Sequence, residues 1–291
     1  MLDRSLQFDV LDSEMEDLAA LVEQRSGIVF AGARRQDFSL RVREYMATHR
    51  HKAPSDLLHA LRLSPGEYDD LLERLLAAPT RFFQPRENFD AFQSRVLPEV
   101  HMRKFWDNPR SLRIWSAGCG AGEEAYSIAL STADAFDRRD AWNMHLVATD
   151  VSRAALQHAE RGVYPRESLE ALPAEQLDAW FARVGDLYMA RPKLRHLVSF
   201  SRANLAEPVY LGRFDCIFCV HVLAYLRADS RSQLVQRFYE CLEPGGYLFL
   251  APDEELPDGA RFQSASLGAT HVFQKQAGGE RRPNTRQGVL L

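Results

Sequence analysis

Two patterns of hydrophobic and polar positions divide the chain. From about residue 13 to residue 78, apolar residues recur three and four positions apart, which is typical of helices, and no strand pattern interrupts them. Past about residue 110, short apolar runs alternate with helical stretches. The change predicts an N-terminal helical domain and linker over residues 1–90 and an α/β domain over residues 91–277. Residues 278–291 are polar and rich in Gly and Arg, so we expect a disordered tail there.

Four helices are predicted in the first region. Ser13 is followed three residues later by Glu16, a capping box that predicts a helix start at this point. The next helices are indicated by the apolar spacing of residues 38–46, by Pro54-Ser55, and by Ser64-Pro65, with the fourth helix ending at residues 77–79.

The second region predicts a parallel sheet with helices on both faces, a doubly wound α/β fold, because strands and helices alternate along it. Helices are expected at about 122–135, 152–161 and 229–242, and an antiparallel edge hairpin is expected from Arg261–Ser264 and Thr270–Gln274. The predicted strands are Leu112–Ser116, His145–Thr149, Leu197–Phe200, Phe214–Cys219 and Tyr247–Leu250.

Composition narrows the function classes without choosing one. A chain of 291 residues suits two domains better than one. Its net charge of −4 gives no overall attraction to nucleic acid or to anionic membranes. Because the N-terminus has no signal-peptide run and no stretch approaches the ~20 apolar residues of a membrane span, we expect a soluble cytoplasmic protein without membrane insertion. We also expect a monomer.

The four cysteines are too few and too irregularly spaced for a disulfide scaffold. Cys216 and Cys219 form a CxxC motif, but they lie three residues apart on a predicted strand. Side chains with that spacing point to opposite faces of a sheet, so the pair cannot chelate one ion. No metal is therefore assigned, and buried small hydrophobic residues are the better interpretation.

The segment from Arg113 to Leu130 is a strand, a loop with three alternating glycines (Gly118, Gly120 and Gly122), and an amphipathic helix. Glycines permit a sharp turn and a close ligand approach. A plain glycine turn remains an alternative, since GxGxG alone is a weak signal. The next predicted strand ends at Asp150, where doubly wound folds hold a ribose diol.

Two acids, Glu123 and Glu124, open the helix after the glycine loop. Carboxylates there would repel a dinucleotide pyrophosphate but would attract an ammonium group. This favours S-adenosylmethionine (SAM), which carries a sulfonium and an ammonium and no phosphate, over NAD. The alternative is that the acids only complement the helix dipole.

Further motifs make the chain resemble the CheR chemotaxis receptor methyltransferases, in the family's order and over about residues 10–275. The resemblance implies a helical domain on a SAM-binding α/β domain, with a small β-subdomain at about residues 180–200, ahead of the fourth strand. It also implies methyl transfer from SAM to glutamates on the cytoplasmic helices of chemoreceptors, with S-adenosylhomocysteine (SAH) as the product. The matching motifs are Thr80-Arg81-Phe82-Phe83, Asn88-Phe89, Trp115–Cys119 with Gly122–Ser127, Ala148-Thr149-Asp150, Gly162-Val163-Tyr164, Asn204-Leu205, Phe214–Cys219, Val222-Leu223 and Tyr225.

The resemblance also implies roles for individual residues. Glu124 would hold the methionine ammonium of the cofactor, and Asp150 would hold its ribose. Tyr225 would lie beside the transferred methyl group. Thr80 would contact the cofactor from the linker, while Asn204 and Leu205 would bracket its adenine.

Departures from the family pattern cluster around the expected active site. Gln84 stands where the family has an arginine at the catalytic centre, and Arg86, two residues on, is the candidate replacement. Ala78 replaces a cofactor-contacting Asn, and Val220-His221 replaces an Arg-Asn pair. His221 is either a cofactor or substrate contact or a structural histidine. Activity is therefore in more doubt than cofactor binding.

The proposed chemistry requires no general base, because a glutamate with a pKa of about 4.3 is ionised at neutral pH. The basic segment containing Arg35, Arg41 and Arg43 is the candidate surface for an acidic helical partner, with a solvated helix face as the alternative. No aromatic residues interleave with these arginines, which disfavours nucleic acid. The stretch from Trp180 to Val198 is short compared with family members that bind a receptor's tethering pentapeptide, so pentapeptide-independent docking is expected.

Three other functions stay open at this stage. The first is a SAM- or SAH-binding relative without transferase activity that acts as an interaction module in a chemosensory pathway. The second is an NAD-dependent oxidoreductase, which the acids after the glycine loop disfavour. The third is an O-methyltransferase for a small acid, which would leave the basic helix without a purpose.

Overall fold

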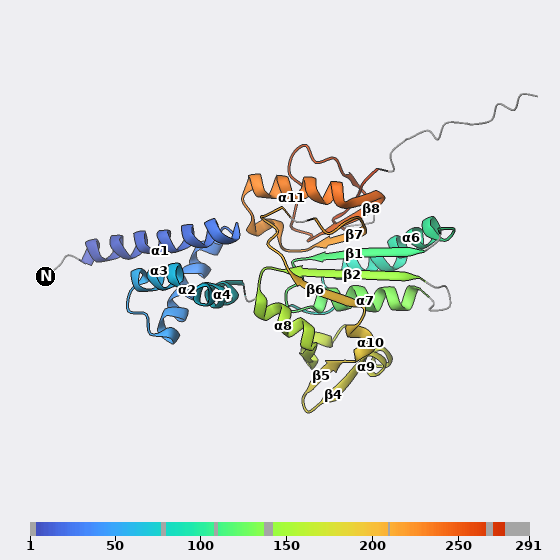
Figure 1. The fold of residues 1–291 in the computed structure, drawn as a ribbon, viewed down its shortest axis with the longest axis horizontal. Helices are drawn as coiled ribbons and strands as arrows, with labels where there is room; N and C mark the ends of the chain where they lie inside the picture. Colours follow the sequence, from blue (N-terminus) through green and yellow to red (C-terminus); the bar gives the residue numbers. More distant parts are fainter. Residues whose placement is uncertain are drawn as a thin grey trace, which may run out of the picture.

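The computed structural model describes residues 4–76, 80–107, 110–136, 142–208, 210–265 and 270–276. A group of four N-terminal helices lies beside a larger domain built on a seven-stranded sheet (Figure 1). The tail predicted at residues 278–291 lies outside the described residues.

The N-terminal helices are α1 (Arg4–Ser26), α2 (Ala33–His49), α3 (Pro54–Leu63) and α4 (Pro65–Leu76). They share one hydrophobic core, to which α1 contributes Leu18 and Val22. The predicted starts at Pro54 and Pro65 are confirmed.

The helix start predicted at Ser13 is wrong. Helix α1 begins at Arg4, so Ser13 lies inside the helix and does not cap it. Residues 4–12 contain neither glycine nor proline, and nothing in their sequence ends the helix before Ser13.

The large sheet has the strand order β6-β2-β1-β7-β8-β10-β9. The pairs from β6 to β8 are all parallel, and β10 pairs antiparallel with both β8 and β9. The parallel sheet and the edge hairpin are therefore confirmed. The chain order reverses at β1, which has β2 on one side and β7 on the other, so the switch point of the sheet lies at the glycine loop. The strands are β1 (Ser111–Ala117), β2 (Asn143–Asp150), β6 (Val198–Arg202), β7 (Phe214–Cys219), β8 (Leu242–Leu250), β9 (Gln263–Ser264) and β10 (Val272–Gln274).

Both faces of the sheet are covered, as predicted. Alternate residues of β7 enter different cores: Cys216 packs with residues of α6 and α7, and Cys219 packs with residues of α11. The two cysteines are free and buried, and the expectation that they face opposite sides is confirmed. The covering helices are α7 (Glu123–Ala135), α8 (Arg153–Arg161), α11 (Ala228–Cys241) and a helical run of α5 (Arg86–Ala91), η1 (Phe92–Val96) and α6 (Leu97–Lys104).

The run from Arg86 to Lys104 was not predicted from the sequence. Its apolar side chains, with Phe82 and Phe83 before it, belong to the core of the sheet domain. A domain boundary at residue 90 stays a prediction, although side chains on both sides of that residue share this core.

A three-stranded antiparallel sheet, ordered β3-β5-β4, forms the small subdomain. Its strands are β3 (Val163–Pro165), β4 (Phe181–Val184) and β5 (Leu187–Ala190), accompanied by η3 (Arg166–Leu169), α9 (Ala174–Trp180) and α10 (Pro192–Arg195). The insertion is confirmed, but its position is corrected. It precedes β6, the third strand of the large sheet in chain order, because β6 pairs with β2 and not with the small sheet.

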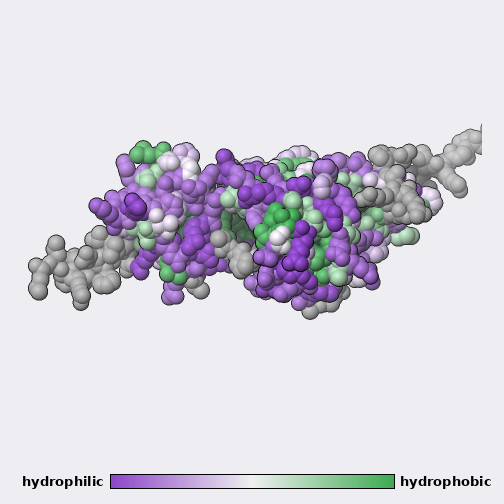
Figure 2. All heavy atoms as spheres, turned by 90° about the horizontal axis from the view of Figure 1, so that it is seen from below, coloured by the Kyte–Doolittle hydropathy of each residue, from purple (hydrophilic) through white to green (hydrophobic). Residues whose placement is uncertain are grey.

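Figure 2, which shows the molecule from below the view of Figure 1, has a largely hydrophilic surface with an apolar patch on the sheet domain.

The helical domain contacts the carboxyl ends of the parallel strands. Arg202, the last residue of β6, forms a two-pronged ion pair with Asp69 of α4, with N–O distances of 2.6 and 3.3 Å. The backbone N–H of Ala154, at the start of α8, donates to Glu73 of α4 at 2.7 Å. These contacts place the first domain over the edge of the sheet where a ligand would bind.

Candidate active site

The glycine loop follows β1, and all three of its glycines have positive φ, at 88° for Gly118, 53° for Gly120 and 99° for Gly122. A Cβ on Gly118 would lie 2.4 Å from Val222 Cγ2, and one on Gly122 would lie 2.7 Å from Ala159 Cβ. These two positions need glycine for packing as well as for backbone conformation.

Gly120 differs from Gly118 and Gly122 because the space that a side chain would occupy at this position is open. The nearest atom to a Cβ placed there is Thr80 Cγ2, at 4.0 Å. Thr80 is exposed and comes from the linker between the domains, so the linker reaches the loop, and a contact between Thr80 and the cofactor stays a prediction. The open side of Gly120 is where a ligand can approach the backbone.

Asp150 ties the loop to the end of β2. Its Oδ2 accepts the N–H of Gly120 and its Oδ1 accepts the N–H of Ser152, both at 2.9 Å. Burial raises the pKa of the Asp150 carboxyl, and these hydrogen bonds oppose the rise. The predicted place of Asp150, at the end of the strand beside β1, is confirmed, and its role toward a ribose stays a prediction.

The two acids at the start of α7 have different environments. Glu123 is only 5% exposed, and its Oε2 has no hydrogen-bond partner among the described residues. Glu124 accepts a hydrogen bond from Ser116 Oγ at 2.6 Å. Burial raises the pKa of Glu124 to about 7; Ser116 opposes this rise and the charge of Glu254 adds to it. A buried carboxylate oxygen without a partner, and a carboxyl whose pKa is raised by burial, are each groups that a nearby cation would stabilise.

A polar cavity of about 300 Å³ lies between the two domains, and one of its lining residues directly follows Asp150 in the sequence. Val151 and Asn204 line it from the sheet domain, and Tyr68 and Leu72 line it from α4. Asn204 is held by its own turn: its Oδ1 accepts from Ala206 N at 3.0 Å and its Nδ2 donates to Glu207 at 3.1 Å. Leu205 is buried in the core on the α11 side of the sheet, so Asn204 reaches the cavity and Leu205 does not line it.

The loop after β7 carries Val220, His221 and, in the short helix η4 (Leu223–Tyr225), Tyr225. His221 has a φ of 58° and an imidazole that is 64% exposed, 3.5 Å from the Asp253 carboxylate. Val220 and Tyr225 are half-buried. The path of this loop is fixed by a residue that the sequence did not reveal.

That residue is Glu254, a buried acid shortly after β8. Its Oε2 accepts the N–H groups of His221 at 3.0 Å and Ala251 at 3.1 Å, and its Oε1 accepts the N–H of Ala224 at 3.2 Å. An acid at the carboxyl end of a buried strand is the signal that identified Asp150, and the same rule applied to β8 gives Asp253, Glu254 and Glu255 without choosing among them.

Gln84, at the position where the resemblance implies an arginine, and Arg86, its candidate replacement, lie near the start of α5. Gln84 is exposed. The Arg86 side chain is 69% exposed, and its Nε lies 3.3 Å from Asp90 Oδ1 on the same helix. Arg86 as a replacement for the arginine therefore stays a prediction, and Ala78 lies outside the described residues.

On α2, Arg35 lies 3.8 Å from Glu16, and Arg41 pairs with Asp37 at 2.9 Å. Arg41 also donates to the backbone oxygen of Arg74 at 3.0 Å. Arg43 is exposed. The three arginines thus lie on one helix at the surface, two of them partly neutralised by acids of the same domain.

Comparison with models of protein families identifies the family to which this chain belongs. Residues 13–76 match the CheR methyltransferase all-alpha domain, and residues 78–272 match the CheR methyltransferase SAM binding domain. The chain belongs to the CheR methyltransferase family. It therefore has the Rossmann-like methyltransferase fold that the pattern predicted, with SAM as its cofactor.

Relatives of this chain in the CheR family align over most of their length. The chemotaxis protein methyltransferase of Listeria monocytogenes is 29% identical over 247 residues, covering 85% of this chain and 92% of the relative. Chemotaxis protein methyltransferase 1 of Pseudomonas aeruginosa is 29% identical over 268 residues, covering 88% and 96%. A solved structure of SAM-bound CalS10, an amino pentose methyltransferase from Micromonospora echinaspora, aligns with 60% of this chain and 58% of that chain at 16% identity, with a TM-score of only 0.32.

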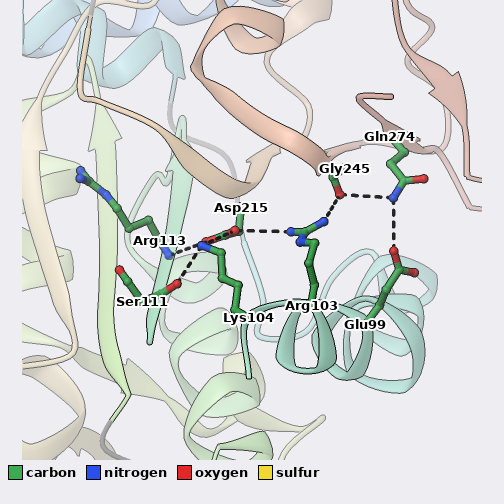
Figure 3. A network of polar contacts seen from close by, with 8 residues as sticks. All are labelled: Glu99, Arg103, Lys104, Ser111, Arg113, Asp215, Gly245 and Gln274. Atoms are coloured by element: carbon green, nitrogen blue, oxygen red, sulfur yellow. Dashed lines mark hydrogen bonds and ion pairs between the residues drawn. The ribbon is translucent and has the colours of Figure 1, made fainter. Parts of the chain in front are cut away.

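The family motif Phe214-Asp215 belongs to the fold and not to the cofactor site. Asp215 lies at the opposite end of β7 from the glycine loop, with its side chain 1% exposed (Figure 3). Its carboxylate accepts from Lys104 Nζ at 2.7 Å, Arg103 at 3.4 Å and the Arg113 N–H at 3.0 Å. The network joins α6, β1 and β7, and Arg103 extends it to the Gly245 carbonyl of β8.

The Gly162-Val163-Tyr164 motif also has a structural role. Gly162 ends α8 in a left-handed conformation, and the buried Tyr164 donates its hydroxyl to the Ala121 carbonyl at 2.8 Å. Through this hydrogen bond, the small sheet supports the glycine loop.

None of the helices in the described part of the chain has the length and hydropathy needed to span a membrane. The same residues contain no group of three side chains that could hold a metal ion.

Proposed function

We propose that this chain transfers the methyl group of SAM to glutamate carboxylates on the cytoplasmic helices of chemoreceptors, and that it acts in the cytoplasm. Membership of the CheR family supports the proposal, together with the chemotaxis names of its relatives. The observation that carries it is the arrangement at the switch point: Gly120 has an open side, Asp150 accepts its N–H, and Glu124 accepts from Ser116 near the end of β1.

In this proposal Glu124 and Glu123 hold the ammonium of the cofactor. The unpartnered Oε2 of Glu123 and the raised pKa of Glu124 are what a bound ammonium would relieve. Asp150 accepts from the ribose hydroxyls, and Thr80 covers the loop from the linker. Asn204 would contact the adenine in the cavity beside Val151, with Leu205 supporting it from below.

The cofactor supplies a methyl group already activated by its sulfonium. Attack by the glutamate oxygen would form the new C–O bond as the C–S bond breaks, and the electron pair would leave on sulfur, so the products would be the methyl ester and SAH. The protein has to align and desolvate the carboxylate, and alignment alone can contribute up to ~7–11 kcal/mol. We assign this role to Tyr225, Gln84 and Arg86, with Val220 and His221 beside the cofactor.

Gln84 makes this chain a slower enzyme than a relative with arginine at that position. A neutral hydrogen bond to the carboxylate contributes roughly 0.5–1.5 kcal/mol, against roughly 1.5–3 kcal/mol for a charged one. The difference corresponds to a loss of about tenfold in rate where Arg86 does not compensate.

For the receptor we propose docking on α2 through Arg35, Arg41 and Arg43, with no tethering pentapeptide. The connection between β4 and β5 is the two-residue turn Gly185-Asp186, which fits the short subdomain expected from the sequence. Truncating a receptor's C-terminal pentapeptide should then leave the methylation rate unchanged.

Calorimetry with SAH, combined with tritiated-methyl transfer onto chemoreceptor cytoplasmic fragments, tests the function. Asp150→Ala should abolish both SAH binding and transfer, whereas Asp258→Ala, at an exposed position, should change neither. Tight SAH binding without transfer to any fragment would indicate a binding module. No heat and no thermal shift at millimolar SAH would refute the assigned cofactor site.

A further inference from the structure

The loop that carries Tyr225 is held from two directions. From the sheet domain, Glu254 accepts backbone N–H groups of His221 and Ala224. From the helical domain, Arg34 of α2 donates to the Ala224 carbonyl and places its guanidinium carbon 4.3 Å from the centroid of the Tyr225 ring.

Backbone contacts from the helical domain also hold the loop that carries Tyr225. The Val29 N–H donates to the Tyr225 carbonyl at 2.8 Å, and Ile28 forms an antiparallel bridge with Leu226. The half-buried Tyr225 ring packs against the core of the helical domain. The position of Tyr225 therefore depends on a domain that contributes none of the glycine loop.

Arg34 suits this role because its guanidinium is planar. It can lie over the face of an aromatic ring while one of its N–H groups donates to a carbonyl. Lysine is a point charge without that geometry, so it can satisfy one contact at a time. The observed pair of contacts, ring face and carbonyl, uses both properties of arginine.

We propose that Arg34 is a positioning residue for Tyr225 and links receptor docking on α2 to the methyl-transfer loop. The inference rests on the proposed function. Arg34 precedes Arg35 in the same 17-residue helix that carries Arg41 and Arg43. A partner that binds those arginines moves or steadies the helix as one body, and Arg34 passes the change to Tyr225.

The test compares Arg34→Met, Arg34→Lys and a matched control, Glu23→Gln. Glu23 also joins the two domains, through an ion pair with Arg227 at 2.9 Å. Arg34→Met should lower kcat for methyl transfer to a chemoreceptor cytoplasmic fragment by about tenfold, since it removes a cation–π contact and a charged hydrogen bond. The KM for the fragment and the SAH affinity should stay within about twofold, because neither site contains Arg34. Arg34→Lys should fall between Arg34→Met and the unaltered protein.

Hydrogen exchange of residues 220–225 supplies a readout that needs no activity. Exchange should accelerate in Arg34→Met and stay unchanged in Glu23→Gln, and bound receptor fragment should slow it more in the unaltered protein than in Arg34→Met. If the unaltered protein transfers no methyl groups, the proposed function fails, while the exchange comparison still tests the positioning of the loop. Equal exchange in the two variants, or a fall in SAH affinity and melting temperature that matches the loss of kcat, overturns the inference.

Discussion

Replacing Glu124 with glutamine tests the proposed ammonium site, because the ionised Glu124 carboxylate is unfavourable when no cation faces it. Burial raises its pKa from 4.5 to about 7. A tenfold change in an ionisation constant corresponds to about 1.4 kcal/mol, so keeping this carboxylate ionised in the cofactor-free protein costs about 3 kcal/mol above pH 7. Glu124→Gln removes the charge and keeps the shape, so it should raise the free energy of unfolding at pH 8 by up to about 3 kcal/mol.

The pH dependence of stability follows from the same raised pKa. A carboxyl whose pKa is higher in the folded state than in the unfolded state binds its proton more tightly when folded. Its contribution to stability is complete below about pH 4.5 and is lost as the pH rises to about 7. The gain from Glu124→Gln should therefore be small below about pH 4.5, grow as the pH rises to about 7, and stay level above that.

Cofactor affinity should respond in the opposite sense. A bound ammonium stabilises the ionised carboxylate, so SAH binds to the deprotonated form. With a pKa of about 7, Glu124 is about 90% ionised at pH 8 and about 10% ionised at pH 6, and the SAH affinity should fall about tenfold between them. Glu124→Gln should bind SAH more weakly at pH 8 and show little of this dependence.

Chemical unfolding at pH 5 and pH 8 measures the effect on stability, and calorimetry at pH 6 and pH 8 measures the effect on SAH affinity. Glu175→Gln, at an exposed position on α9, is the control. Calorimetry in buffers of different ionisation enthalpy should also detect proton release on SAH binding at pH 6.5. The reasoning would be refuted by a Glu124→Gln variant that is less stable at pH 8 and binds SAH as the unaltered protein does.

Three further predictions concern the fold around the site. Gly120→Ala should lose SAH affinity at least tenfold in calorimetry at a stability cost of about 1–2 kcal/mol, whereas Gly122→Ala should lose considerably more stability, because its Cβ would meet atoms within 3.0 Å. Asp215→Asn should lower the free energy of unfolding in urea by about 2–4 kcal/mol, since it leaves Lys104 and Arg103 without a charged partner. Glu254→Gln should cost about 1.5–3 kcal/mol in the same assay and accelerate hydrogen exchange after β7.

Periodicity was sufficient to predict the strands of the large sheet. Phe214–Cys219 was predicted to the residue, because its six positions are all buried and Gly212 and Arg213 precede them. The approach of Gly120 to Asp150 was also predictable. It follows from the parallel pairing of β1 and β2, which brings the ends of both strands to one edge.

The helical run from Arg86 to Lys104 was missed because prolines obscure it. Pro85 precedes α5, and Pro98 falls at the start of α6, where it follows the π-helical turn η1. Proline in a periodic stretch normally indicates a helix end. Here the altered hydrogen-bond spacing of η1 accommodates it, so the helix continues past a residue that sequence rules interpret as a stop.

The polar networks were missed for a different reason. Asp215 meets Arg103 across 112 positions of sequence, and Glu254 meets His221 across 33. No local spacing rule relates such residues, since the contacts exist only after the sheet has formed. The sequence could indicate that an acid lies at the end of a strand, but not which backbone groups it would bind.

The path of the loop after β7 does not depend on the two residues, Val220 and His221, at which this chain departs from the pattern that the resemblance implies. Glu254 holds the loop after β7 through backbone N–H groups, and Val29 holds Tyr225 through its carbonyl. These bonds are independent of side-chain identity at Val220 and His221. The His221 imidazole is largely exposed, and its left-handed backbone would suit asparagine, the family residue, at least as well. In the proposed site, having Val-His where the resemblance implies Arg-Asn would therefore change the groups that face the substrate without changing the path of the loop. A low rate of transfer would accordingly reflect the chemistry of Gln84 and His221 and not a collapsed site.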